Sequence, residues 1–209
     1  MDSRFSDVVT TEAQLRDVLG NPSQRVIDKQ VATLDDHSRK FLSVSPFVLL
    51  ASCDAAGNMD VSPKGDPAGF VHVLDDKTLA IPDRLGNRRA DTIRNVLQNP
   101  NVGMIFLVPG KEETLRINGT AIIVRDRWLR EQMAIDGKLP DQALVITVKE
   151  VFFHCAKCVI RSKLWQSERW PDLSGQSSLA QAMVDEARLT ETVAEMQAII
   201  DRDVRERLY

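Results

Sequence analysis

The sequence predicts a mainly β protein, an antiparallel barrel or sandwich of six or seven strands with helices at its flanks. Short apolar runs bounded by turn residues recur between residues 46 and 155. These runs follow one another as hairpins and do not alternate with long helices, so a parallel sheet is not expected. Apolar residues with helical spacing occupy the two ends of the chain and two short segments between the strands.

The N-terminal segment over residues 10–43 has helical spacing. Thr10 is expected to cap a first helix, and Gly20 to end it. Asp35 is expected to cap a second piece. Pro46 ends the run, because proline has no amide hydrogen for a helical hydrogen bond.

From Pro46 onward the apolar period changes to that of strands. Strands or hairpins are expected over 47–54, 58–66, 69–83, 101–110, 112–124 and 142–155. Short helices are expected over 88–99 and 125–137. The tail from about residue 177 is typical of a long helix, with Val193, Met196 and Ile200 on one apolar stripe. This stripe is expected to cover the barrel or a partner subunit.

The composition is that of a soluble globular protein, with 43% hydrophobic and 27% charged residues in 209. The 27 Lys and Arg do not outnumber the 30 Asp and Glu, so neither nucleic acid nor an anionic membrane is an expected partner. The first ten residues lack a signal-peptide pattern, no apolar run approaches the roughly 20 residues of a membrane span, and three cysteines fit a reducing cytoplasm. We expect one structural domain: a helical segment (1–45), a barrel (46–165) and a helical extension (166–209).

Two adjacent arginines, Arg88 and Arg89, follow a Gly-Asn turn and are expected to open a helix with Asn87 as its cap. Cations at a helix start oppose the dipole at a cost of about 0.3–1 kcal/mol each, so their presence indicates a compensating anion. Unpaired amides and guanidinium groups together suit a phosphate. The alternative is that the arginines pair with Asp83 and Asp91 on a solvated corner.

A second stretch, "DVSPKGDPAGF" over residues 60–70, brings a strand to an end. Pro63 has no amide to donate, so it belongs at a sheet edge or where pairing stops. The stretch is either part of a ligand site or a wide hairpin connection with a solvated Lys64.

Taken in order, these motifs resemble the pyridoxamine 5′-phosphate oxidase-like family of FMN-binding split barrels. The resemblance runs from about residue 30 to residue 165 and rests on "SPKGD", "LGNRRADT", "NPNVGMIF", "NGTA" and the late element "HCAKCVIRSKLW" over 154–165. It implies a six-stranded antiparallel split barrel, a homodimer, and one FMN per subunit in a groove between the two chains.

The resemblance also implies which residues contact FMN. They are Val61, Ser62, Pro63, Lys64, Pro82, Asp83, Asn87, Arg88, Arg89, Arg116, Arg161, Ser162 and Trp165. Of these, Arg88 and Arg89 would hold the phosphate, and Lys64 would lie near the reactive edge of the ring. The late element would reach the flavin of the partner subunit.

The implied function is an FMN-dependent oxidoreductase that transfers hydride between flavin and a small molecule or reduced nicotinamide. The oxidases that give the family its name grip pyridoxal phosphate with an Arg- and His-containing segment. Here "RSKLWQSERW" occupies that region and no His follows it, so vitamin B6 oxidation is not implied. The alternatives are a flavin-binding module without turnover, which would serve electron transfer or sensing, and a split barrel that binds F420 or haem.

A C-x-x-C pair, Cys155 and Cys158, lies within the late element. Zinc would need two further ligands at suitable spacing, and a redox dithiol usually follows a βαβ unit, which this chain lacks. We therefore expect incidental thiols here, with a redox pair as the alternative. No metal site and no catalytic residue are predicted.

Overall fold

The computed structural model describes residues 4–209. The strands are β1 (Phe47–Cys53), β2 (Met59–Gly65), β3 (His72–Val73), β4 (Thr78–Asp83), β5 (Asn101–Leu107), β6 (Thr114–Val124) and β7 (Gln142–His154). The helices are α1 (Glu12–Leu19), α2 (Gln24–Asp28), α3 (Asp36–Leu42), α4 (Asp91–Gln98), α5 (Arg127–Gln132), α6 (Lys157–Ser162), α7 (Leu179–Ala187) and α8 (Val193–Arg207). A 3₁₀ turn covers Ser167–Arg169. No described helix is both long and apolar enough to cross a bilayer.

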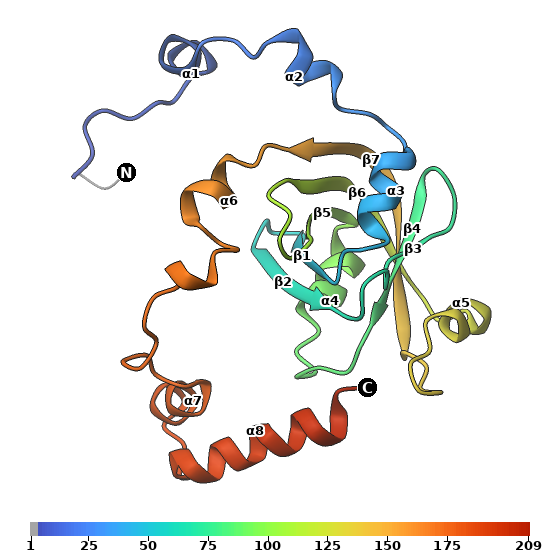
Figure 1. Cartoon of the computed structure of the whole chain (residues 1–209), viewed down its shortest axis with the longest axis vertical. Coiled ribbons are helices and arrows are strands. Elements are labelled where there is room, and N and C mark those ends of the chain that lie inside the picture. Colours follow the sequence, from blue (N-terminus) through green and yellow to red (C-terminus); the bar gives the residue numbers. More distant parts are fainter. Residues whose placement is uncertain (1–3) are drawn as a thin grey trace.

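All seven strands form one antiparallel sheet in the order β2-β1-β5-β6-β7-β4-β3 (Figure 1). The expected mainly antiparallel fold with flanking helices is confirmed. The sheet is not closed, and its seven strands lie within the six or seven that the hairpin pattern predicts, one more than the six that the resemblance implies. The shortest strand is β3, which pairs with β4 at only two positions, His72 with Ala80 and Val73 with Leu79, and completes the hairpin expected over 69–83.

The sheet and helix α3 enclose a common hydrophobic core. In β1, Val48 and Leu50 are buried while their neighbours are less so, which is the alternation expected of a strand with one face inward. Phe41 and Leu42 of α3 are buried in the same core. As expected, Asp35 caps α3, because its carboxylate accepts the backbone N–H of Ser38 at 2.8 Å.

The two longest strands, β6 and β7, shift register between Asn118 and Gly119. A Cβ atom at Gly119 would overlap the carbonyl oxygen of Thr147, so only glycine fits this close approach. The irregularity lies midway along β6, where a bulge can bend the pair and help the sheet to curve.

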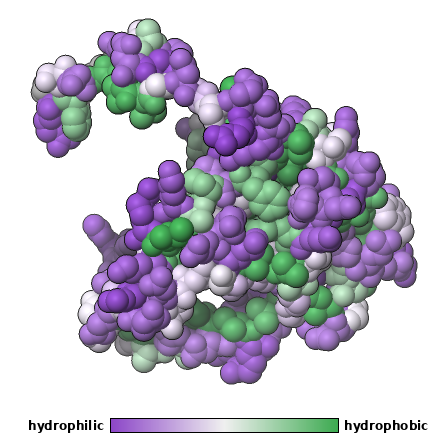
Figure 2. All heavy atoms as spheres, turned by 45° about the horizontal axis from the view of Figure 1, so that its top comes forward, coloured by the Kyte–Doolittle hydropathy of each residue, from purple (hydrophilic) through white to green (hydrophobic). Residues whose placement is uncertain are grey.

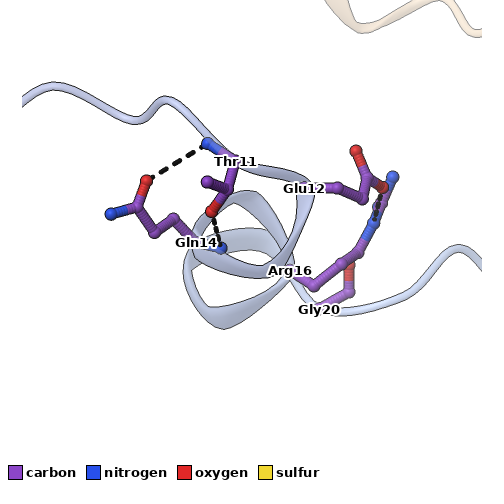
Figure 3. A network of polar contacts seen from close by, with 5 residues as sticks. All are labelled: Thr11, Glu12, Gln14, Arg16 and Gly20. Atoms are coloured by element: carbon purple, nitrogen blue, oxygen red, sulfur yellow. Dashed lines mark hydrogen bonds and ion pairs between the residues drawn. The ribbon is translucent and has the colours of Figure 1, made fainter.

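Helix α1 begins one residue later than expected, because Thr11 and not Thr10 is its cap (Figure 3). The Thr11 hydroxyl accepts the backbone N–H of Gln14 at 3.2 Å, and the Gln14 side chain accepts the Thr11 N–H at 3.2 Å. Such a reciprocal box requires a spacing of three residues, which Thr11 has and Thr10 lacks. Arg16 adds an ion pair with Glu12 at 2.7 Å.

The N-terminal and C-terminal helical segments bury fewer of their residues than the barrel does. Helices α1 and α2 bury no residue, and the N-terminal segment stands out from the body of the molecule (Figures 1 and 2). It joins the barrel where Val31 bridges Val151 and Lys29 donates to the Phe153 carbonyl at 2.9 Å. The tail forms two helices, and α7 and α8 pack on each other with Ala180 and Met196 buried.

Candidate functional site

The loop from β4 to α4 is irregular, and α4 begins later than the sequence indicated. Arg88 and Ala90 have positive φ angles of 63° and 56°, which the first turn of a helix does not tolerate. The helix therefore begins at Asp91, and the expectation that the two arginines open it is wrong. Asn87 is not its cap either, since its side-chain oxygen accepts the N–H of Arg89 at 3.0 Å within the loop.

Arg84, at the start of this loop, is fully engaged with the protein. Its guanidinium forms a 2.6 Å ion pair with Asp66, whose side chain is only 1% exposed. It also donates to the Met133 carbonyl at 2.8 Å and lies 5.6 Å from the centre of the Tyr209 ring. Arg84 is thus a structural cation, and its charge is already balanced.

Arg89 and Arg88 lie in different surroundings. Arg89 is exposed and pairs with Asp91 at 2.9 Å, and this hydrogen bond and the charge of Asp91 raise its pKa. The Arg88 side chain forms no hydrogen bond or ion pair with any residue of the described range 4–209. The alternative of a solvated, paired corner therefore holds for Arg89 and not for Arg88.

A cleft of about 680 Å³ opens beside this loop, within the about 300–1,000 Å³ that small-molecule sites occupy. Its walls come from the ends of β2 and β4, the loop after β4, the first turn of α4, the start of β7 and the end of α8. The predicted site residues that line it are Ser62, Pro63, Lys64, Pro82, Asp83, Asn87 and Arg88. Strands β2 and β4 are not neighbours in the sheet, so the curvature of the sheet brings these residues together.

Thr92 also lines the cleft, and the sequence reasoning missed it. The residue is 4% exposed, and its hydroxyl finds no hydrogen-bond partner among the residues described. A buried polar group without a partner costs about 1–3 kcal/mol, so this hydroxyl indicates a ligand. Thr92 lies in the first turn of α4, where backbone amides have no partner within the helix. The signal for it in the sequence was a polar residue, Thr92, two positions after "RRA".

Lys64 and Asp83 face each other across the cleft from β2 and β4. The ammonium lies 3.7 Å from the carboxylate, and both side chains are mostly buried, at 16% and 24% exposure. Asp83 also accepts a hydrogen bond from Gln142 at 2.9 Å. The pair fixes the position of the lysine. Pro63 lies in β2, an edge strand, as expected for a residue without an amide hydrogen.

Two predicted residues, Val61 and Arg116, lie outside this cleft on the outer face of the sheet. Register places Val61 on that face with Ala51, and Arg116 opposite Ile105. The Arg116 guanidinium lies 4.9 Å from the centre of the Phe152 ring. Neither side chain lines the cleft of its own chain.

The late element also lies away from the cleft. Arg161 is exposed, and the Ser162 hydroxyl donates to the Val159 carbonyl at 3.1 Å. The Trp165 indole donates to the Lys111 carbonyl at 2.8 Å. These residues cannot contact a ligand in the cleft of the same chain in this arrangement, and a contact with a partner's ligand stays a prediction.

Other titratable groups add little to the site. Burial and, next, the charge of Arg84 lower the pKa of His72, so that its imidazole is neutral near pH 7. Cys155 and Cys158 are exposed free thiols. Within residues 4–209, no group of three or more His, Cys, Asp or Glu side chains is placed to hold a metal ion.

A model of the pyridoxamine 5′-phosphate oxidase family matches residues 34–155, which is more than half of the chain. No curated protein matches the sequence. Among solved structures, HupZ of Group A Streptococcus is similar at 19% identity, with 57% of this chain and 93% of that chain covered and a TM-score of 0.47. A putative pyridoxamine 5′-phosphate oxidase of Lactobacillus delbrueckii is similar at 21% identity, with 58% of this chain and 95% of that chain covered and a TM-score of 0.47. An FMN-binding protein of Syntrophomonas wolfei is similar at 9% identity, with 56% of this chain and 88% of that chain covered and a TM-score of 0.42.

Proposed function

Because this chain belongs to the pyridoxamine 5′-phosphate oxidase family, we propose that it binds FMN in the cleft and acts as an FMN-dependent oxidoreductase on a small molecule. The observation that carries the proposal is a pair of hydrogen-bond donors in this cleft that no protein acceptor satisfies. They are the Arg88 guanidinium without a protein partner and the buried Thr92 hydroxyl without a hydrogen bond.

The phosphate would bind at the start of α4. A dianion there would accept hydrogen bonds from Arg88, from Thr92 and from the unpaired amides of the first turn. The positive φ angles at Arg88 and Ala90 support this, since strained backbone is found preferentially at ligand sites. Arg89 contributes less, because its side chain does not line the cleft.

The ring would lie between the ends of β2 and β4. Ser62, Pro63 and Pro82 offer a wall with few polar groups, as flat aromatic ligands require. When bound, FMN supplies the capacity to accept and release hydride. The ammonium of Lys64, which is paired with Asp83, would lie beside the ring and could donate a hydrogen bond to its reduced, anionic form.

We further propose a homodimer formed through the outer face of β1, β2 and β5. The apolar side chains of Phe47, Met59, Val61 and Ile105 are 37–68% exposed on this one face, and such a patch marks a protein interface. A partner would bring its own late element, with Arg161, Ser162 and Trp165, toward the cleft. Three free cysteines support a cytoplasmic, reducing location.

Reconstitution tests the function in two steps. The purified protein is first mixed with FMN and its absorption spectrum is recorded. The FMN-loaded protein is then mixed anaerobically with NADH and with NADPH. Binding followed by bleaching of the flavin band is the expected result, with Arg94→Ala, an exposed arginine of α4 outside the cleft, behaving as wild type. A protein that does not bind FMN but binds F420 or haem would overturn the assignment of FMN as the cofactor. FMN binding without reduction would favour the non-catalytic module.

A further inference from the structure

The end of α8 supplies the cleft with a cation that lies more than a hundred residues from the loop after β4. Arg207 lines the cleft, although most of α8 runs clear of the barrel (Figure 1). No pattern near Arg207 in the sequence indicates a ligand. Its role follows from where the fold places it.

Tyr209 holds this end of α8 against the barrel through contacts with Arg84 and Lys138, which we call the latch. The ring of Tyr209 lies 5.6 Å from the Arg84 guanidinium, within the range of a cation–π contact. Lys138 donates to the Tyr209 carbonyl at 3.1 Å. Desolvation and, next, the carboxylate of Asp66 raise the pKa of the Tyr209 hydroxyl, which is therefore uncharged near pH 7. The latch joins α8 to the Arg84–Asp66 pair.

Charge balance separates Arg207 from most other cations of the cleft. Arg84 is neutralised by Asp66 and Lys64 by Asp83. Arg207 has one partner, Asp203, at 2.7 Å one helical turn back, and both side chains are about half exposed. An exposed pair of this kind is weak, so the Arg207 guanidinium can exchange its partner for an anion in the cleft.

A carboxylate of the cleft does not take up this charge. Asp141 also lines the cleft, yet it forms no ion pair with Arg207. Arg88, which has no partner among the described residues, belongs with Thr92 at the start of α4. The cleft is therefore lined by two cations that can each take an anionic group, Arg88 on the loop after β4 and Arg207 at the end of α8.

We propose that Arg207 binds the carboxylate or other anionic group of the small molecule that reacts in the cleft, and that Tyr209 positions it. This assignment rests on the proposed function, in which Arg88 and Thr92 hold the phosphate of FMN. It names the class of substrate: a small, anionic organic molecule. Arg207 would select for charge, because a planar guanidinium matches a carboxylate with two parallel hydrogen bonds.

Benzoate and benzamide test this, because they have nearly the same shape and differ in charge. Each is titrated into the FMN-loaded protein while the flavin absorption spectrum is followed. Arg207→Gln should weaken benzoate binding about tenfold or more, the effect of losing one charge-assisted hydrogen bond, and leave benzamide unchanged. Arg205→Gln is the matched control, because Arg205 lies on the same helix, is 69% exposed and does not line the cleft.

The latch is tested with two variants of Tyr209. Tyr209→Phe keeps the ring against Arg84 and should bind benzoate as wild type does, whereas Tyr209→Ala should weaken benzoate but not benzamide. FMN affinity is measured in every variant. Failure of wild type to bind FMN would overturn the proposed function itself. If FMN binds, the assignment of Arg207 is overturned when the wild-type protein does not bind benzoate more tightly than benzamide, or when Arg207→Gln binds benzoate as wild type does. It is also overturned when Arg207→Gln loses as much affinity for FMN as for benzoate.

Discussion

The two ends of the loop between β4 and α4 place the same residue type in opposite situations. At the start, Arg84 is mostly buried, paired with Asp66 and bonded to a backbone carbonyl. Toward the end, Arg88 is exposed to the cleft without a protein partner, and the nearby Thr92 hydroxyl is buried without a hydrogen bond. The charge of Arg84 is balanced within the protein, whereas Arg88 has hydrogen-bond donors that a ligand can use. Partner and burial, not residue type or sequence spacing, distinguish a structural cation from a ligand-binding one.

The largest effect is expected when the structural end is broken. Arg84→Met would leave the carboxylate of Asp66 buried and unpaired, which costs about 3–5 kcal/mol of folding free energy. Urea unfolding measures the loss. The exposed Arg94→Met should stay within about 0.5 kcal/mol of wild type. A loss below about 1 kcal/mol for Arg84→Met would mean that its pair with Asp66 is not structural.

At the other end, the expected effect is on the ligand and not on the fold. Arg88→Ala should weaken FMN binding by about 1.5–3 kcal/mol, the worth of one charge-assisted hydrogen bond. Its unfolding free energy without FMN should change by less than about 0.5 kcal/mol, because no protein contact is lost. Fluorescence titration with FMN and urea unfolding give the two numbers, with Arg94→Ala as control. If Arg88→Ala lost stability and kept its FMN affinity, Arg88 would be a structural cation like Arg84.

Thr92→Val should have effects of opposite sign on the fold and on the ligand. Without FMN the variant should be as stable as wild type or more so, because a buried hydroxyl without a partner is replaced by a methyl group. FMN affinity should fall by about 0.5–1.5 kcal/mol, the net worth of a hydrogen bond. Thermal unfolding with and without FMN measures both. A variant that is less stable without FMN would show that the hydroxyl already has a partner in the protein.

Arg89→Ala should give the smallest change. Its side chain does not line the cleft, and its exposed pair with Asp91 adds little to the fold, so neither FMN affinity nor stability should differ from wild type beyond experimental error. The same titration and unfolding experiments apply. A loss of FMN affinity as large as that of Arg88→Ala would mean that the pair with Asp91 opens for the ligand.

Local patterns in the sequence predicted most of the fold. The hairpins β1–β2, β3–β4 and β5–β6 follow from alternating apolar residues between turns, and Asp35 was recognised as a cap. The late start of α4 could not be predicted, because the positive φ at Arg88 and Ala90 depends on how the loop is held between β4 and the barrel.

The candidate site was predicted in part. Seven of the predicted residues line the cleft because they lie in two contiguous motifs, "SPK" and "PDRLGNR". Thr92 was missed because its burial follows from α4 packing on β1, β2 and β6. Arg207 was missed because only the path of the tail brings it to the cleft. Val61, Arg116 and the late element lie elsewhere in the single chain, and their predicted role needs a second subunit.

The claim that the start of α4 binds a phosphate is tested most directly by comparing FMN with riboflavin, which has the same ring system and no phosphate. Both affinities are measured by fluorescence titration for wild type and for the double variant Arg88→Ala, Thr92→Val. Wild type should prefer FMN by about a hundredfold or more, the combined effect of two such contacts. The double variant should lose most of this preference with its riboflavin affinity unchanged. Equal binding of the two ligands by wild type, or an undiminished preference in the double variant, would contradict the account.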